Sequence, residues 1–462
     1  MKTHIDRLWN FSDFLFLTGL AVALFLGSKV TPLLVVAGVL PIPFLLHALK
    51  NRHYHVSIWM LLAPFGVYFA YSLIALFFFT GLEASDPHPV NPSLESYSIA
   101  IAMLAVGLVR SLQIKDLASK FRRLMPWLLV ACFAVLSYMM FAGIRDACRV
   151  RGLAPWPFIP AFLFSTLTFI CLVGWERLSN RERLLRVGLL ALSIIVSTTY
   201  TGSRGVAVAQ VGVFGVLLIL SFLPSLSNGI PRWYHLASAA VAGAVVSALI
   251  GFATDCGPAS RFSSTFETLG TLTSQLTTAG EENAPTQPLP AQPEPAPAPA
   301  PAPTMAQIPQ ASEPAVASTP ETNQSTEVTK DDAIGLRLSM WETSIAAIKE
   351  SPVFGHGSLY LQKLIHATYG FEHNHNQYLT WLVTGGVLQL TLGLIFLAIP
   401  WFVSKGLSTA DRLLLTTGVS LFWAIAMMFD SFLNLKFYTH YFCLLCGVLY
   451  ALSNSMQERA ET

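Results

Sequence analysis

Long uninterrupted runs of apolar residues dominate the pattern of this chain. Runs long enough to cross a hydrocarbon core of about 30 Å occur at 11–27, 31–49, 57–81, 97–112, 126–142, 156–175, 185–201, 206–223, 236–253, 377–403, 411–430 and 436–453. They have the length of helices and lack period-2 alternation. Because lipid cannot satisfy backbone hydrogen bonds, each run is expected to be helical. The pattern predicts an all-α polytopic membrane protein with about twelve transmembrane helices.

The gaps between these runs predict three parts. Helices one to nine would occupy 1–253, a long loop 254–376, and helices ten to twelve with a cytoplasmic tail 377–462. Residues from about 280 to 330 are rich in Pro, Ala, Gln, Glu and Thr and carry almost no aromatic residue, so they cannot bury a core. This insertion is expected to be a disordered segment or a semi-rigid polyproline spacer.

The flanks of the insertion, roughly 254–275 and 333–376, are expected to be structured and to pack together over the bundle. The sequence LRLSMWETSIAAIKES has apolar residues at helical spacing, and the helix should end before Pro352.

Basic residues orient the predicted bundle. They gather in alternate connections, which should be cytoplasmic: Lys50, Arg52, Lys115, Lys120, Arg122, Arg123, Arg177, Arg181, Arg183, Arg186, Arg232, Lys405, Arg412 and Arg459. An even number of helices then places both termini in the cytoplasm and the long loop outside. The first apolar run has no small-residue cleavage site after it, so we expect a retained helix.

Composition agrees with this class of protein. The chain is 53% hydrophobic and only 12% charged, with a formal net charge of +2. Its basic residues form no single tract, so nucleic acid is excluded as an expected partner, and membrane lipids are the expected surroundings.

Arginines break the charge rule on the predicted outer side. A trio lies between the fifth and sixth helices, one arginine lies in a tight turn, and two lie in the long loop: Arg145, Arg149, Arg151, Arg204, Arg261 and Arg337. Arginine binds phosphate through two parallel hydrogen bonds and keeps its charge, so these residues are hypothesised to bind an anionic substrate. Contact of the trio with lipid head groups is an equal alternative.

The other outer arginines differ in their surroundings. Arg204 lies in the short turn Gly202-Ser203-Arg204-Gly205, where glycines let backbone amides approach a ligand, which favours anion binding. An ion pair with Glu267 or Asp255 explains Arg261 as well as substrate contact does. Arg337 precedes Trp341 by four residues on a predicted helix, so a cation–π pair competes with a functional role.

The run His373-Asn374-His375-Asn376 directly precedes the tenth apolar run. Imidazole can remove a proton from an attacking hydroxyl without a metal, and His375 is the favoured general base. A zinc site is less favoured, because residues two apart do not share a helix face and neither H-E-x-x-H nor a cysteine pair is present. No metal and no cofactor is therefore expected. Asn376 fits a helix N-cap, with the histidines merely exposed as the structural alternative.

Cysteines offer one further hypothesis. Cys148 and Cys256 both fall in predicted outer loops, and a disulfide between them would tie the fifth–sixth loop to the long loop in an oxidising compartment.

Four short motifs together resemble the O-antigen ligase and polymerase superfamily. They are Ser203-Arg204-Gly205, the helix Arg337-x-x-x-Trp341, the turn Pro352-x-x-Gly355-x-Gly357, and His375-Asn376-Gln377-Tyr378-Leu379 at the start of a membrane helix. Their order, spacing and topology agree with the family over most of the chain. The Pro/Ala-rich insertion departs from the family pattern and touches none of these motifs.

The resemblance implies a metal-independent, inverting glycosyltransferase with a GT-C type bundle and a large periplasmic loop, in the bacterial inner membrane. Its donor would be a glycan linked to undecaprenyl pyrophosphate, and lipid A-core its acceptor. Arg204 and Arg337 would stabilise the pyrophosphate leaving group, His375 would act as general base, and the lipid tail would lie in a groove between helices. Further substrate contacts are expected from Arg261, His373, Arg145, Arg149, Arg151, Asn376, Trp341 and Tyr378.

Other functions remain open on the sequence alone. A polymerase that extends the glycan on its lipid carrier shares the donor chemistry. A transporter for lipid-linked sugars is a second alternative, although such proteins usually place polar groups at the membrane midplane and repeat their halves. A scaffold of a glycan-assembly complex is a third.

Overall fold

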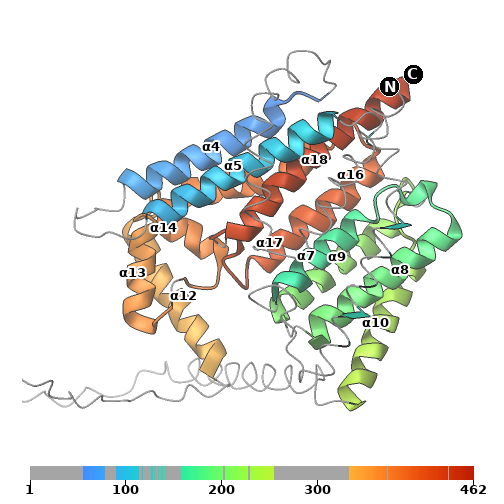
Figure 1. Cartoon of the computed structure of the whole chain (residues 1–462). Helices are drawn as coiled ribbons and strands as arrows, with labels where there is room; N and C mark the ends of the chain where they lie inside the picture. Colours follow the sequence, from blue (N-terminus) through green and yellow to red (C-terminus); the bar gives the residue numbers. More distant parts are fainter. Residues whose placement is uncertain are drawn as a thin grey trace, which may run out of the picture. The chain divides into compact units, whose positions relative to one another are not determined.

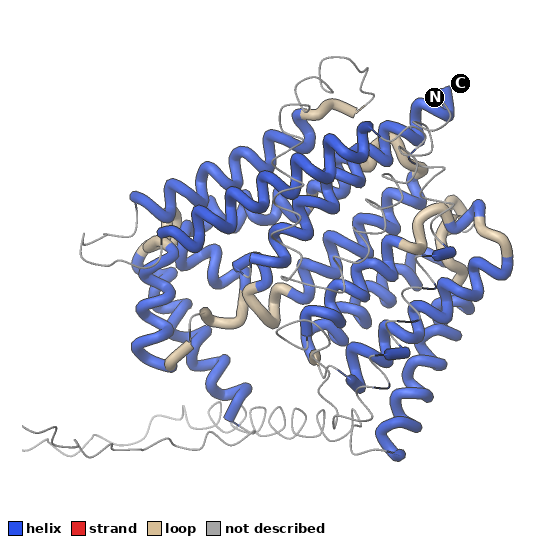
Figure 2. Tube along the Cα trace, viewed as in Figure 1, coloured by secondary structure: helices blue, strands red, loops and turns tan. Residues whose placement is uncertain are grey.

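The computed structural model describes residues 56–78, 90–113, 158–200, 203–226, 229–253, 332–371, 373–434 and 436–461, with isolated positions between 117 and 141. Within these ranges the regular structure is helical and no strand occurs (Figure 2). Contacts divide the chain into one unit of Met1–Phe262 with Leu336–Thr462 and another of Ser263–Gly335. The site residues described below lie in the first unit.

The helices in chain order are α4 (Trp59–Phe78), α5 (Val90–Gln113), α7 (Phe158–Ile170), α8 (Asn180–Ile195), α9 (Arg204–Ser221), α10 (Trp233–Ala253), α12 (Asp332–Glu350), α13 (Ser358–Tyr369), α14 (Gln377–Leu397), α15 (Ile399–Val403), α16 (Thr409–Leu415), α17 (Phe422–Ala426) and α18 (Lys436–Glu461). Short π-helical turns continue α8 over Val196–Tyr200 and join α16 to α17 over Thr416–Leu421. Single 3-10 turns lie at Trp175–Arg177 and Phe432–Asn434.

Small residues bring neighbouring helices close together. α5 packs along α18 (Figure 1), and a Cβ atom on Gly107 or Gly447 would lie within 3 Å of the backbone of the other helix. Close backbone approach at glycine is the usual way in which helices associate in lipid, where no hydrophobic effect drives them together.

An aromatic cluster joins α7, α17 and α18. Phe162 lies with its ring centroid 4.7 Å from that of Trp423 and 4.9 Å from that of Tyr438. The Trp423 indole N–H donates to the hydroxyl of Thr166, at 3.2 Å, so its polar atom is satisfied inside the core. This packing holds α17 in place, and the turn that follows it begins after Ala426.

α14 is broken in its middle at two glycines. Gly385 and Gly386 have non-helical backbone angles, and Gly386 has φ +65°. The Pro352–Gly357 turn fills the break: the amides of His356 and Gly357 donate to the carbonyls of Val383 and Thr384, at 2.7 and 2.8 Å. Beyond the break the Val387 amide donates to the carbonyl of Pro352, at 2.8 Å. The turn therefore satisfies backbone groups that the broken helix cannot.

Glycine is required on both sides of this contact. A Cβ atom on Gly355, which has φ +70°, would lie 2.6 Å from the Gly385 nitrogen, and one on Gly386 would lie 2.1 Å from the Val353 carbonyl. Positive φ and backbone contact both exclude larger residues. The glycines of the Pro-x-x-Gly-x-Gly motif thus dock the segment before α13 into α14.

The predicted helical class is confirmed, whereas the number of membrane helices stays a prediction. Three described helices are long and apolar enough to cross a membrane: Arg204–Ser221, Trp233–Phe252 and Gln377–Leu397. Shorter apolar helices cover Trp59–Ala75, Ser98–Val109 and Ala161–Ile170. The runs predicted at 11–27 and 31–49, and most of 126–142, lie outside the described residues.

Candidate functional site

Asn376 caps α14 and so fixes where the His-Asn run ends. Its side-chain oxygen accepts from the amides of Tyr378 and Leu379, at 3.0 and 3.1 Å. Its side-chain nitrogen donates to the carbonyl of Met428, at 3.2 Å. The predicted N-cap is confirmed, and it also binds α14 to the turn that follows α17.

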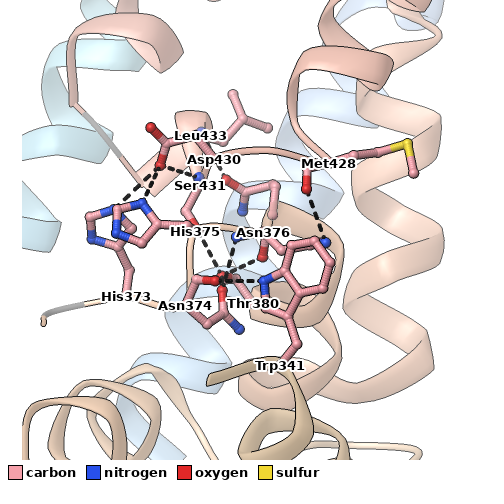
Figure 3. A network of polar contacts seen from close by, with 11 residues as sticks. Trp341, His373, Asn374, His375, Asn376, Thr380, Met428, Asp430, Ser431 and Leu433 are labelled. Atoms are coloured by element: carbon pink, nitrogen blue, oxygen red, sulfur yellow. Dashed lines mark hydrogen bonds and ion pairs between the residues drawn. The ribbon is translucent and has the colours of Figure 1, made fainter. Parts of the chain in front are cut away.

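Asn374 is the buried centre of the site (Figure 3). Its side-chain oxygen accepts from the Asn376 amide at 3.2 Å and from the Thr380 hydroxyl at 2.9 Å. Its side-chain nitrogen donates to the hydroxyl of Ser344 on α12, at 3.0 Å. The Trp341 indole donates to the Asn374 carbonyl, at 2.9 Å. One asparagine thus ties α12 to the start of α14.

These bonds give Trp341 a specific role. The sequence left open a cation–π or stacking pair with Arg337, but the indole N–H is directed at the backbone of the His-Asn run. Tyr378, on the first turn of α14, donates its hydroxyl proton to the carbonyl of Ala424, at 2.6 Å. Both aromatic residues therefore position the site through hydrogen bonds to backbone.

His373 and His375 converge on one carboxylate, that of Asp430. The Nε2 atom of His373 lies 3.4 Å and the Nδ1 atom of His375 lies 3.3 Å from the same oxygen of Asp430. The two imidazole rings lie 4.4 Å apart between centroids. Contact through Nδ1 directs the other ring nitrogen of His375, Nε2, away from the carboxylate.

The backbone of His375 has an unusual conformation. It is the one described residue other than glycine with positive φ, at +54°. Left-handed backbone costs a non-glycine residue of order 1 kcal/mol or more and is typically found at functional sites.

Asp430 was missed by sequence reasoning. It was included at the end of the apolar run 411–430, but α17 ends at Ala426, and Asp430 lies in the turn beyond it. Its one visible signal was an acidic residue at the outer end of an apolar run, on the same predicted side as the arginines. Burial raises the pKa of Asp430, but hydrogen bonds from His373 and His375 outweigh burial and hold that pKa below its usual range. Asp430 is therefore ionised at neutral pH.

Arg204 and Arg337 come close to this carboxylate from two different helices. Burial lowers the pKa of Arg337, Asp430 raises it, and the positive charge of Arg204 lowers it, with a net lowering. Although part of Arg337 is exposed, its guanidinium group thus shares one electrostatic neighbourhood with Asp430 and Arg204. The predicted role of these two arginines in binding an anionic substrate stays a prediction.

The glycine of the Ser-Arg-Gly turn has a packing role. A Cβ atom on Gly205 would lie 2.7 Å from Cβ of Phe429, the neighbour of Asp430. Glycine therefore lets the N-terminus of α9, which carries Arg204, lie against the turn that carries the carboxylate. The sequence had assigned the flanking glycines to ligand approach.

An apolar cavity of about 690 Å³ lies among α8, α9 and α10. Its lining on α9 includes Val208, Val211, Gly215 and Leu218. These positions continue the helical stripe on which Arg204 stands, four, seven, eleven and fourteen residues further along. On α10 the lining includes Ala237, Ala240 and Ala244, whose small side chains leave the space open.

Several predicted site residues and the disulfide lie outside the described residues: Arg145, Arg149, Arg151, Arg261, Cys148 and Cys256. Their roles stay predictions.

The class of protein is thus a helical membrane protein with a polar site at one end of its helices. Comparison with known families gives the family. Residues 188–398 match the family model described as O-Antigen ligase, so this part of the chain is an O-antigen ligase family domain. The match includes Arg204, Arg337 and His375 and ends before Asp430. The superfamily inferred from the four motifs is confirmed.

A relative was also found among curated proteins. An uncharacterized protein of Haemophilus influenzae is 35% identical over 91 residues, which are 17% of this chain and 23% of that protein. The chain therefore matches only about a quarter of the length of this relative, whose description assigns no activity.

Proposed function

We propose that this chain is a glycosyltransferase of the O-antigen ligase type. It transfers a glycan from undecaprenyl pyrophosphate to a sugar hydroxyl of lipid A-core, at the periplasmic face of the bacterial inner membrane. Family membership supports ligase or polymerase activity on lipid-linked glycans. The observation that carries the proposal is the contact of His375 with Asp430, at 3.3 Å, in the electrostatic neighbourhood of Arg337.

His375 is proposed as the general base. Asp430 accepts from Nδ1, which leaves the lone pair on Nε2 to take the proton of the acceptor hydroxyl. The acceptor oxygen then forms a bond to the anomeric carbon while the bond from that carbon to the pyrophosphate oxygen breaks. A single displacement of this kind inverts the anomeric centre and uses no metal. The carboxylate stabilises the imidazolium that results.

Arg204 and Arg337 are proposed to bind the pyrophosphate. The leaving group departs with the electron pair of the broken bond, so negative charge grows on it in the transition state. Two guanidinium groups already in place are suited to stabilise this charge without rearrangement. Burial is the main cause of the lowered pKa of Arg337, and repulsion from Arg204 adds to it; a bound anion would offset that repulsion.

The cavity among α8, α9 and α10 is proposed to hold the first part of the isoprenoid tail. Arg204 stands at the end of the same stripe of α9 that lines the cavity, so a lipid whose pyrophosphate binds Arg204 has its tail directed along this apolar surface. The length of α9 from Ala207 to Leu218, at about 1.5 Å per residue, corresponds to roughly 16 Å. That length suits only the part of a long tail nearest the pyrophosphate.

The test is a transferase assay with purified full-length protein, offering lipid A-core and, separately, a second carrier-linked unit as acceptors. We expect transfer to lipid A-core, and a loss of about 10²- to 10⁴-fold in His375→Ala. His366→Ala, in an exposed histidine of α13, should retain the rate. Product only with the carrier-linked acceptor would contradict the ligase proposal in favour of a polymerase. An undiminished rate in His375→Ala would contradict the mechanism.

The transporter and scaffold alternatives predict a different result. Neither needs His375 for chemistry, so cells with His375→Ala would show normal lipopolysaccharide. For a ligase, such cells should accumulate carrier-linked polymer together with free core. The location of the charged residues at the helix ends supports the enzyme.

A further inference from the structure

We infer that His373, His375 and Asp430 form a binding site for Zn²⁺ or a similar transition-metal ion, and that occupation of this site inhibits the enzyme. The binding stands on geometry alone. The inhibition rests on the proposed function, because it requires His375 to be the general base.

Two of the three distances among the ligand atoms match those of a tetrahedral zinc site. Zinc lies 2.0–2.2 Å from nitrogen and oxygen ligands, so two ligand atoms of a tetrahedron lie about 3.3–3.6 Å apart. The Asp430 oxygen lies 3.4 Å from Nε2 of His373 and 3.3 Å from Nδ1 of His375. All three ligand atoms lie within 4.8 Å of one another. Two edges of the tetrahedron are therefore already in place.

The helix-face argument against zinc does not apply to residues that lie outside a helix. It assumed that residues two apart must share a helix face to bind one ion. His373 and His375 precede α14, and both rings contact the same oxygen of Asp430. The third ligand, Asp430, comes from a separate turn and could not be found by motif spacing.

The three ligand side chains are partly exposed to solvent, and the carboxylate is held by a hydrogen bond. The side chains of His373, His375 and Asp430 are 25%, 19% and 15% exposed, so an ion can reach them from solvent. The Asp430 oxygen accepts from the Ser431 amide, at 2.8 Å, which holds the carboxylate in place. Three protein ligands leave a fourth position for water. Imidazole nitrogens favour zinc and similar ions over Mg²⁺, which prefers oxygen.

Metal binding and base catalysis exclude each other on His375. A neutral imidazole has one nitrogen with a lone pair and one with a proton. An ion bound to Nδ1 uses that lone pair and moves the proton to Nε2, which then cannot accept a proton from the acceptor hydroxyl. The ion also takes the carboxylate that orients the ring. Zinc should therefore abolish transfer without displacing the lipid donor.

The binding experiment uses the purified full-length protein, stripped with chelator and titrated with Zn²⁺ against a chromophoric competitor. We expect one ion per chain at this site, and at least about tenfold weaker binding in His373→Ala and in Asp430→Asn. His366→Ala serves as the matched control and should bind zinc as the unaltered protein does. Thermal unfolding in the presence of Zn²⁺ provides a second measurement, in which the upward shift should disappear in His373→Ala.

The inhibition experiment measures transfer with and without Zn²⁺, each variant being compared with its own metal-free rate. Zinc should inhibit the unaltered protein, chelator should restore the rate, and Mg²⁺ should have no effect. Unchanged zinc affinity in His373→Ala, or no binding at all, would overturn the site. Binding at the site with full activity would leave the site in place and overturn the assignment of His375 as base. Activity that requires zinc would overturn inhibition and the metal-independent mechanism together.

Discussion

The His-Asn end of α14 and the α8–α10 cavity are built by opposite means. Around Asn374 and Asn376, position is set by directed hydrogen bonds among α12, α14 and the turn after α17. The cavity, in contrast, exists because side chains are small: Ala240 and Ala244 leave space between the helices. Hydrogen bonds define one geometry, whereas apolar contact tolerates many. The proposed chemistry needs the first, and the proposed lipid tail needs only the second.

This contrast implies a steep response to substitution at the His-Asn end and a graded one in the cavity. The largest effect is expected where the polar end is anchored. Gly386→Ala places a Cβ atom 2.1 Å from the Val353 carbonyl at a residue with φ +65°. We expect a loss of more than about 4 kcal/mol of stability, which should remove the folded protein. Protein level and thermal unfolding measure this, and Gly66→Ala, with nothing within 4 Å of the added atom, should be tolerated.

The next effect concerns orientation of the base. Asp430→Asn keeps the size of the side chain and removes the charge that stabilises the imidazolium of His375. Transfer should fall by roughly 10²- to 10³-fold while the amount of protein is kept. Steady-state kinetics with saturating donor measure this as a change in kcat. If the rate fell less than threefold, the carboxylate would be a structural partner only.

A third effect tests the network itself. Asn374→Ala removes bonds to Ser344, Thr380 and the Asn376 amide from a fully buried position. Unpaired buried groups should cost about 2–3 kcal/mol. Thermal unfolding of the purified protein provides the measurement. Thr368→Ala, which removes an exposed bond within α13, should cost less than about 0.5 kcal/mol. Equal effects of the two variants would contradict a special role of Asn374.

The smallest effect is expected in the cavity. Ala240→Phe fills part of the space proposed for the tail, so KM for a long-chain donor should rise about three- to tenfold with little change in kcat. Val241→Phe, on the exposed neighbouring position of α10, is the matched control. A donor with a short tail should not distinguish the two variants. An equal rise in KM for both donors would place the tail elsewhere.

Sequence reasoning succeeded where pattern is local. Apolar runs predicted the helices of the described part closely, and the N-cap at Asn376 and the helix before Pro352 followed from local rules. The charge of Arg204 acts on Arg337, as does that of Asp430, which agrees with the expectation that these arginines lie on one side of the membrane. Each of these predictions needed only neighbours in the chain or the alternation of loops.

The sequence predictions missed features that depend on contacts between distant segments of the chain. Asp430 acquires its role only because a turn after α17 lies against His373 and His375, and no spacing rule links these positions. Likewise, Gly205 and Gly355 suggested ligand approach or turn geometry, whereas their contacts with Phe429 and Gly385 are between segments. Close packing between distant segments requires glycine, but a glycine in the sequence does not indicate which segment it contacts.

The broken helix α14 has a consequence for how this protein can vary. Because the Pro352–Gly357 turn is hydrogen-bonded into the break, the placement of α12 and α13 beside His375 is set by contacts after Asp332. The number of residues between α10 and α12 should then affect the free energy of folding mainly through the entropy of closing that loop. Doubling such a length costs only about 0.6 kcal/mol. A change in the length of the segment 280–330, which the sequence predicts to be disordered, should therefore alter the stability of the site little.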